Sequence, residues 1–284
     1  MKPISLALLS IALVALPAAA AENVPVDCQQ RFHTEYGFGA QTYYAQETRT
    51  IARNSISVLS LRPSHNGGVA VEGWDQPDIQ VTACKSADEQ SRLSQLRMVV
   101  NGGDVTSEGP DESGWTVHFV VRVPNGINLS AEAQNGPLSF RHVNGTVNAH
   151  TQNGPVSVQD CTGGINADAH NGPISVSGSS GKVKAEAQNG PVTIRLRDSE
   201  WHGEGLQAST HNGPISLRVP ANYRSGVEVV SEGRSPFSCR ICKSEQRTWD
   251  DDGTKRVHFG APGAPVVVRV STVNGPVSIG DTFE

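Results

Sequence analysis

The stretch AQNGPLSF, residues 133–140, decides how we expect this chain to fold, because close variants of it return five more times. The other copies are TQNGPVSV (151–158), AHNGPISV (169–176), AQNGPVTI (187–194), THNGPISL (210–217) and TVNGPVSI (272–279). The glycines of the first four copies follow one another at intervals of 18 residues, and Gly145, Gly163 and Gly181 lie midway between them. A fixed period of this kind is typical of stacked structural repeats.

Between the turns, apolar and polar residues alternate, as a half-buried strand requires. After each triplet, one inward column contains Leu138, Val156, Ile174, Val192, Ile215 and Val277, and the next contains Phe140, Val158, Val176, Ile194, Leu217 and Ile279. The opposite strands contribute Val147, Ile165 and Val183, followed by small residues such as Ala149, Ala167 and Ala185. We therefore predict an all-β fold, a flattened single-stranded β-solenoid (β-helix-like) with about 18 residues and two strands per coil. Its coils would stack in parallel about 4.8 Å apart.

The Asn-Gly-Pro triplets are predicted to be the structural corners of these coils. Glycine would supply a positive φ at the turn, and proline would fix φ where the next strand begins. Asparagines at equivalent corners could join successive coils through a ladder of side-chain amide hydrogen bonds. The corner residues are Asn135, Gly136, Pro137, Asn153, Gly154, Pro155, Asn171, Gly172, Pro173, Asn189, Gly190, Pro191, Asn212, Gly213, Pro214, Asn274, Gly275 and Pro276.

The remaining segments divide the chain into three parts. Residues 1–21 have a lysine near the start, an apolar run and small residues at the end, as a secretory signal peptide does. Residues 22–54 are predicted to form an N-terminal segment and cap, and 55–284 the solenoid. Loop excursions are expected near 197–205, around Trp201, and at 223–264. The apolar run is too short for a membrane span, so we predict an exported protein, periplasmic or extracellular, with no transmembrane segment.

Five cysteines in an exported chain favour disulfide formation. Cys239 and Cys242 form a CxxC whose surroundings resemble a hairpin or long loop, so a local structural disulfide is favoured over redox or metal chemistry. Cys28 and Cys84, both in the first third of the chain, are the other predicted disulfide cysteines, and Cys161 is left over.

The repeats resemble a known group of proteins. The segments NGGVAVEGWDQPDIQVTA (66–83) and VRVPNGINLSAEAQNG (121–136), with the closing STVNGPVSI (271–279), are similar to the bacterial β-strand-repeat "putative adhesin" family, a domain of unknown function. The similarity covers roughly residues 55–279, although that family often has Gly-Asp where this chain has Gly-Pro. The resemblance implies an exported, solenoid-like module, and it brings no catalytic residues.

Outward-facing residues are the candidate functional residues. His150, Asp168 and His170 would lie close together on one face, as a polar patch for a divalent metal or a glycan, or simply as a solvated wall. The other face carries a regular series of hydroxyl residues beside Arg141, Arg195 and Arg218. This arrangement suggests sugar binding, whereas the arginines disfavour an ice-binding surface.

The sequence contains no recognisable catalytic motif such as GxSxG or HExxH, and no basic or aromatic stripe that would indicate nucleic-acid binding. We predict a non-catalytic protein without a cofactor that contacts an unknown protein or an envelope glycan, and no nucleic acid. The alternative is a carbohydrate-active β-helix enzyme that uses carboxylates of the two excursions. Those carboxylates are Glu200, Glu204, Asp250, Asp251 and Asp252.

Overall fold

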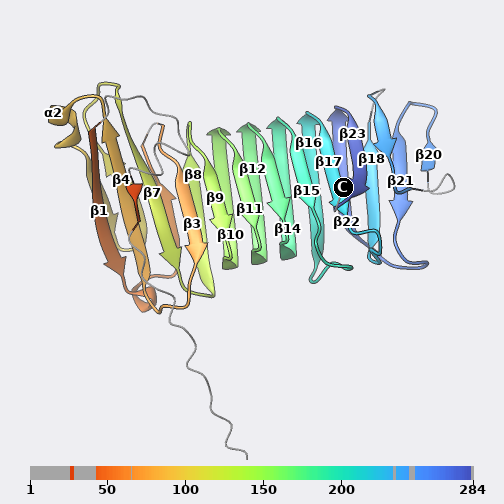
Figure 1. The fold of residues 1–284 in the computed structure, drawn as a ribbon, viewed down its shortest axis with the longest axis horizontal. Coiled ribbons are helices and arrows are strands. Elements are labelled where there is room, and N and C mark those ends of the chain that lie inside the picture. Colours follow the sequence, from red (N-terminus) through yellow and green to blue (C-terminus); the bar gives the residue numbers. More distant parts are fainter. Residues whose placement is uncertain (1–25, 29–42, 65, 233–234, 243–246, 283–284) are drawn as a thin grey trace, which may run out of the picture.

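The structure is a computed structural model, and it describes residues 26–28, 43–64, 66–232, 235–242 and 247–282. The predicted all-β class is confirmed, because two large mixed sheets lie face to face along the whole length of the molecule (Figure 1). We call the 11-stranded sheet, from β1 to β19, sheet A, and the 12-stranded sheet, from β20 to β5, sheet B. The predicted signal peptide, residues 1–21, lies outside the described residues.

In the central part of the molecule the chain passes alternately through the two sheets, and we call one passage through a strand of each sheet a coil. Its sheet A strands are β9 (Leu138–Arg141), β11 (Val156–Gln159), β13 (Ile174–Ser177), β15 (Val192–Arg195), β17 (Ile215–Val219) and β23 (Val277–Asp281). Its sheet B strands are β8 (Ile127–Ala133), β10 (Asn144–Asn153), β12 (Thr162–Asn171), β14 (Ser180–Asn189), β16 (Gly205–Asn212) and β22 (Val266–Asn274). Neighbouring strands within each of these two series pair in parallel.

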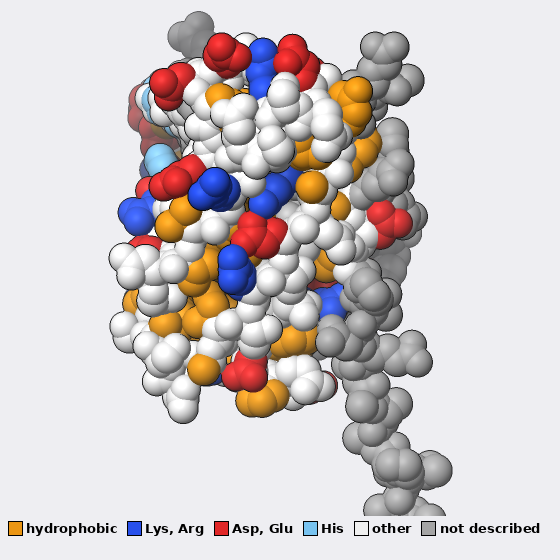
Figure 2. Space-filling view, turned by 90° about the vertical axis from the view of Figure 1, so that its left-hand side faces the viewer, with side chains coloured by type: hydrophobic (Ala, Val, Ile, Leu, Met, Phe, Trp, Pro, Cys, Tyr) orange, Lys and Arg blue, Asp and Glu red, His pale blue; other side chains and the backbone are white. Residues whose placement is uncertain are grey.

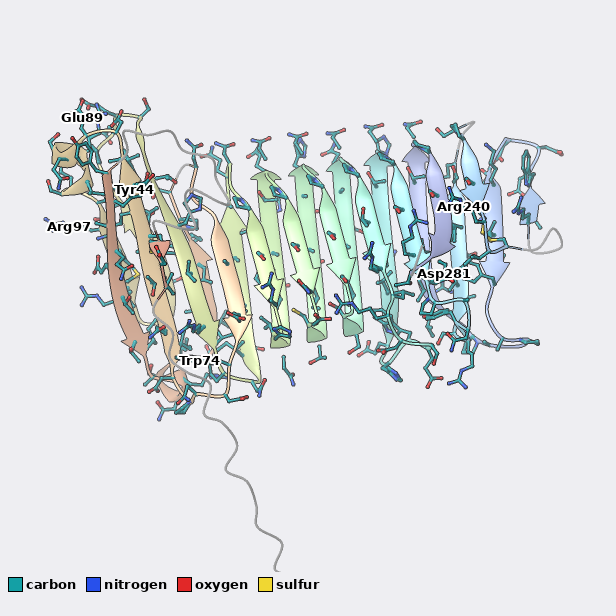
Figure 3. All side chains as sticks on the ribbon, in the orientation of Figure 1. Tyr44, Trp74, Glu89, Arg97, Arg240 and Asp281 are labelled. Carbon is teal, nitrogen blue, oxygen red and sulfur yellow. A yellow bond between two sulfur atoms is a disulfide. The ribbon has the colours of Figure 1, made fainter. Side chains whose placement is uncertain are left out.

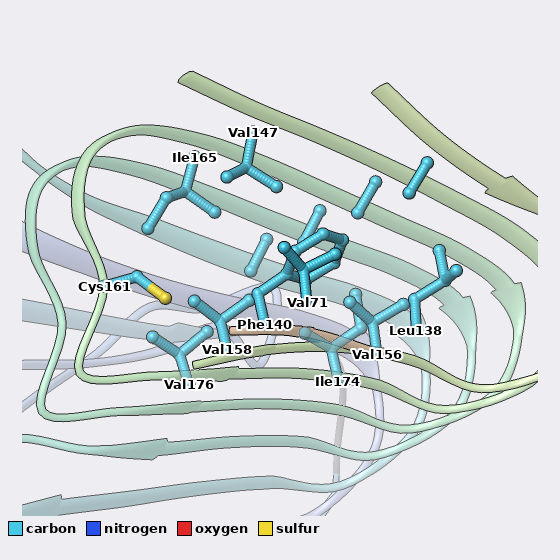
Figure 4. Packing of buried hydrophobic residues seen from close by; sticks show 14 of the residues in the cluster. Val71, Leu138, Phe140, Val147, Val156, Val158, Cys161, Ile165, Ile174 and Val176 are labelled. Atoms are coloured by element: carbon cyan, nitrogen blue, oxygen red, sulfur yellow. The ribbon is translucent and has the colours of Figure 1, made fainter. Parts of the chain in front are cut away.

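The pairing register confirms the residue columns that the alternation predicts. Val156 lies opposite Leu138 and Ile174, and Val158 lies opposite Phe140 and Val176. These side chains point into the space between the sheets, toward Val147 and Ile165 of sheet B (Figure 4). The core between the sheets therefore combines large residues of sheet A with valine, isoleucine and alanine side chains of sheet B.

The triplet corners are joined by the predicted amide ladder. Asn153 donates a side-chain hydrogen bond to Asn135 at 2.8 Å, and Asn171 donates to Asn153 at 2.9 Å. The ladder continues through Asn189, Asn212 and Asn274, and at its other end Asn135 donates to Asn66. Backbone bonds run beside it, since Gly154 N–H donates to the carbonyl of Asn171 and Val156 N–H to that of Pro173. The corner amides and carbonyls are thereby paired from one coil to the next.

The reason predicted for the corner glycines is wrong. None of the six triplet glycines has a positive φ. Gly163, which lies midway between two triplets, does have a positive φ, of 115°. The triplet glycines are needed because a Cβ at each would overlap the carbonyl oxygen of the stacked glycine before it, as Gly172 would with Gly154. Close approach between stacked backbones, and not left-handed backbone geometry, therefore selects glycine at this corner.

The N-terminal end of the stack does not follow chain order. β2 (Leu59–Arg62) and β3 (Val69–Gly73) pair with β8 and β9, so this early segment forms the coil next to the first triplet. Beyond it, sheet A ends in β7 (Trp115–Val123), β4 (Ile79–Ala87) and β1 (Tyr43–Ile51), which pair antiparallel. Sheet B ends in β6 (Asp104–Glu108) and β5 (Arg97–Asn101). The short helices η1 (Arg53–Ser55) and α2 (Gln90–Leu93) follow β1 and β4 in the chain, and α2 contacts both of these strands.

This end carries charges of both signs among apolar side chains (Figure 2). Glu47 of β1 pairs with Lys85 at 2.6 Å and with Arg49 at 2.9 Å. Burial opposes ionisation of Glu47, but the hydrogen bonds from Lys85 and Arg49 outweigh it, and the pKa of this carboxyl is lowered. Charged side chains on the outermost strand discourage edge-to-edge association of sheets.

At the C-terminal end the structure differs from the expected excursion at 223–264. That segment contains β18 (Gly226–Ser231), β19 (Phe237–Cys239), β20 (Arg247–Trp249) and β21 (Lys255–Phe259). β18 and β19 form a further coil, and β22 and β23 insert between it and β16 and β17. The antiparallel hairpin of β20 and β21 then covers the edge of β18. Before β19 the sequence reads Arg-Ser-Pro (234–236) where the repeats have Asn-Gly-Pro, so it contains no asparagine that could extend the amide ladder.

Two disulfides hold the ends of the stack. Cys28 is bonded to Cys84 of β4, and Cys239 of β19 to Cys242. The first bond fixes residues 26–28 against the outer face of sheet A, where Val26, Tyr44 and Val120 surround it. Cys161 is a free, buried cysteine at a corner of the coil, and its burial raises the pKa of the thiol to about 11. A thiol with this pKa is not a reactive nucleophile at neutral pH.

Candidate functional site

The predicted polar patch lies on the outer face of sheet B, where side chains repeat regularly from strand to strand (Figure 3). The pairing register places Glu132, His150, Asp168 and Glu186 in one row across β8, β10, β12 and β14. Within that row, His150 Nδ1 and Asp168 Oδ1 are hydrogen-bonded at 2.7 Å. Both side chains are exposed, at 59% and 44% of their surface, so the pair is accessible to a ligand.

A shallow groove of about 310 Å³ follows this row. Its lining combines carboxylates, amides, a hydroxyl, one imidazole and one ammonium group, contributed by Ser130, Glu132, Asn148, His150, Asn166, Asp168, Lys184 and Glu186, together with Ala149. We call it the sheet B groove. It contains two of the three residues of the predicted patch, since His170 lies two residues beyond Asp168, exposed, and does not line it. The sequence analysis did not identify the neighbouring row of the lining, which consists of Ser130, Asn148, Asn166 and Lys184. Each lies two residues before a member of the first row, so the alternation along the strand could have shown that it points outward.

The groove differs from a metal centre. Among the residues that the structure describes, no group of three or more His, Cys, Asp and Glu is arranged to hold a metal ion. The Glu186 carboxylate is 2.8 Å from Lys184 Nζ, and Asp168 is engaged by His150, so two of the three carboxylates of the groove have partners within its lining. The arrangement offers hydrogen-bond donors and acceptors along a line, which suits a ligand rich in hydroxyl or amide groups.

The 197–205 segment does not form a cleft beside a sheet face. Trp201 is partly buried against the core, and its Nε1–H donates to the carbonyl of Gly181 at 3.0 Å. The space left under this segment is about 10 Å³, roughly the room of one water molecule. This loop therefore closes a corner of the coil.

The carboxylates of the enzyme alternative are engaged in separate contacts. Glu200 pairs with Arg224 at 3.3 Å, Glu204 with Lys182 at 3.2 Å, and Asp250 with Arg256 at 3.2 Å. Asp252 accepts a hydrogen bond from the Thr254 backbone N–H at 2.8 Å, and hydrogen bonds from Thr254 lower its pKa. A glycosidase acid needs a raised pKa and a second carboxylate nearby, so this turn is not suited to that role.

The outer face of sheet A has a different chemistry. The outward residues of β9, β11, β13, β15 and β17 are Ser139, Arg141, Ser157, Gln159, Ser175, Ser177, Thr193, Arg195, Ser216 and Arg218. We call this surface the sheet A face. It contains hydroxyls, one amide and three guanidinium groups, and none of these ten residues is acidic.

Comparisons with known proteins give no assignment. No protein family and no curated protein matches this sequence. Two similar solved structures are a putative cell adhesion protein from Clostridium sporogenes, 13% identical with a TM-score of 0.30, and a putative adhesin from Bacteroides fragilis, 12% identical with a TM-score of 0.42. Each alignment covers 84% of this chain, and 100% and 97% of the other chain respectively. No helix in the described part of the chain is long and apolar enough to span a membrane.

Proposed function

We propose that this chain is an exported, non-catalytic β-solenoid that contacts a glycan or a protein of the cell envelope through the sheet B groove. The solenoid part of the proposal is supported by the parallel register, which relates residues 18 positions apart through strands β8 to β14. Export is supported by the two disulfides, because such bonds persist in oxidising compartments.

The observation that carries the binding proposal is the polar lining of the groove. Side chains from four neighbouring strands contribute to it, and the His150–Asp168 hydrogen bond fixes the orientation of the imidazole. Amide, carboxylate and imidazole groups on a flat sheet can each bond a hydroxyl of an extended ligand. Because these strands are tied to one another by ladder bonds, the groups are preorganised and lose little conformational freedom on binding.

The enzyme alternative receives less support from the same geometry. A glycosidase on a stacked β fold needs loops that stand beside one face and bring two carboxylates together. Here residues 223–264 contribute strands to the stack, and the 197–205 loop closes onto the core through Trp201.

The test is a panel of purified oligosaccharides and polysaccharides, with binding and product formation measured on the same samples. We expect binding without turnover, and turnover with product release would overturn the non-catalytic proposal. The double variant His150→Gln/Asp168→Asn should weaken binding by about tenfold, as expected for loss of a few ligand hydrogen bonds. The matched control His211→Gln/Asp198→Asn removes the same two kinds of group outside the groove lining and should bind like the wild type.

A protein partner is examined by affinity capture from envelope extracts with the same variants. One dominant protein that is retained by the wild type and by the control, but lost with the groove variant, would support a protein contact. If the groove variant keeps all glycan and protein binding, the groove is not the site.

A further inference from the structure

We propose that the sheet A face is a second, independent binding surface, and that its ligand is an anionic glycan chain lying along the stack, across the strands. The proposal does not depend on the sheet B groove, because the two surfaces belong to opposite sheets and share no residue.

The first observation is the state of the positive charges. On sheet B, Lys182 pairs with Glu204, Lys184 with Glu186 and Arg269 with Glu228, each within 3.3 Å. On the sheet A face, the guanidinium groups of Arg141, Arg195 and Arg218 have no ion pair or hydrogen bond with any residue that the structure describes. These three cations of sheet B are thus neutralised within the protein, whereas the three arginines of the sheet A face are available to a ligand.

The second observation is the row of hydroxyls beside these arginines. Ser139, Ser157, Ser175, Thr193 and Ser216 occupy equivalent positions on successive strands, and Ser278 of β23 continues the row. None of these six side chains makes a hydrogen bond within the described part of the chain. Each is half-buried in a fixed place on a strand, so the row presents a donor and an acceptor about every 4.8 Å.

The third observation is the spacing of the arginines. Arg195 and Arg218 are on neighbouring strands, about 5 Å apart along the stack, whereas Arg141 is three strands from Arg195, about 14 Å away. One small anion cannot contact all three groups, but a chain with repeated anionic groups can. Guanidinium groups bind carboxylate, sulfate or phosphate through paired N–H donors, while the hydroxyl row matches sugar hydroxyls between them.

The charge around the face is consistent with such a ligand. The whole chain has a formal net charge of −5, and the ten residues of the sheet A face nevertheless contribute only positive charge. The first acidic residue in the arginine row is Glu72 of β3, which lies beside Arg141 on one side and Arg122 on the other. The face has no aromatic residue on which nucleic-acid bases could stack, and no apolar anchor typical of a protein interface.

The test uses the full chain with three probes: polygalacturonate, which carries carboxylates, dextran sulfate, which carries sulfates, and neutral dextran. We expect either anionic polymer to bind with an affinity that falls as salt rises, whereas neutral dextran should show no salt-dependent binding and none that depends on the three arginines. The triple variant Arg141→Gln/Arg195→Gln/Arg218→Gln should lose about tenfold or more in affinity, since three simultaneous contacts are removed. The polymer that binds more tightly identifies the anionic group.

The matched control is Arg62→Gln/Lys182→Gln/Arg269→Gln, which removes the same net charge from paired cations of sheet B outside the sheet B groove. It should bind the anionic polymer like the wild type, and an equal loss would show that total charge, not the sheet A face, is responsible. The variant Arg141→Lys/Arg195→Lys/Arg218→Lys should retain salt-dependent binding at reduced affinity, because it keeps the charge without the paired donors. Salt-independent binding of the anionic polymers, or undiminished binding by the Arg→Gln variant, would overturn the proposal.

Discussion

The Cα of Gly154 lies so close to the carbonyl oxygen of Gly136 that a Cβ on Gly154 would overlap this oxygen. The two glycines occupy the same corner of neighbouring coils, and Gly154 N–H donates in turn to the carbonyl of Asn171 in the next coil. The corner is therefore a place where three backbone segments meet with no room for a side chain. A side chain at any of these corners would push neighbouring coils apart, so the triplet glycines are needed for the stability of the whole stack.

We expect Gly172→Ala to destabilise the protein by at least about 2 kcal/mol, because its methyl group would meet the carbonyl of Gly154 and separate the coils. Gly164→Ala, in the same coil, is the control. A Cβ there has only the Thr146 side chain within reach, at 3.8 Å, so the change should stay within about 1 kcal/mol. Urea unfolding followed by circular dichroism measures both, and equal effects would contradict the close-approach explanation.

The amide ladder gives a second prediction. Asn171 donates to Asn153 and accepts from Asn189, so Asn171→Asp keeps an acceptor but replaces the donor by a carboxylate oxygen that faces the Asn153 oxygen. We expect Asn171→Asp to be less stable than Asn171→Ala at pH 7, because two acceptors then oppose each other. Below the pKa of the new carboxyl, its proton can donate and the difference should shrink. Unfolding midpoints at pH 7 and pH 4, each compared with wild type at the same pH, measure this effect, and a pH-independent difference would contradict it.

The central columns of the fold could be predicted from the sequence because period and alternation determine them. A period of 18 residues places Val156 beside Leu138 and Ile174 in any arrangement that stacks these coils in order. The reason for glycine at the corner could not be predicted, since close approach depends on the distance between coils and not on the local sequence. The φ values at that corner, which are not positive, became known only from the structure.

The order of the coils at the two ends could be predicted only in part. The corner before β19 lacks the Asn-Gly pair, but its Pro236-Phe237-Ser238-Cys239 follows the same pattern as Pro276-Val277-Ser278-Ile279, and this signal could have identified the last coil. The same pattern could not show that β22 lies between β16 and β18, and β23 between β17 and β19. The order of strands along the chain does not determine their order in a sheet. For the sheet B groove, the sequence placed His150 and Asp168 in one row, but it could not show that His170 lies outside the lining.

Because of the buried His118 of β7, we expect the folded protein to lose stability in acid. Its Nδ1 accepts a hydrogen bond from Gly68 N–H at 2.8 Å, and burial lowers the pKa of this imidazole from 6.5 to about 4. The unfolded chain therefore takes up this proton at a higher pH than the folded protein does. The contribution of His118 is complete above about pH 6.5 and is lost as the pH falls toward 4, in total about 3 kcal/mol.

The variant His118→Asn tests this assignment, because its side-chain oxygen can accept from Gly68 without titrating. We expect the wild type to lose more stability than the variant between pH 7 and pH 4, measured as the difference in urea midpoint. Parallel pH profiles of the two proteins would show that other groups cause the acid sensitivity.

The two disulfides should differ in their contribution to stability. Cys28–Cys84 closes a loop with a sequence separation of 56, whereas Cys239–Cys242 closes one of only 3. The entropy of loop closure in the unfolded chain gives about 4 kcal/mol for the first and about 2 kcal/mol for the second. Cys28→Ser/Cys84→Ser should therefore lower the unfolding midpoint more than Cys239→Ser/Cys242→Ser. The first variant also releases residues 26–28 from the hydrophobic contacts around Val120, which adds to the expected loss. Differential scanning calorimetry of the two variants without reductant measures the contrast, and a larger effect at Cys239–Cys242 would show that closure of the last coil limits the stability of the stack.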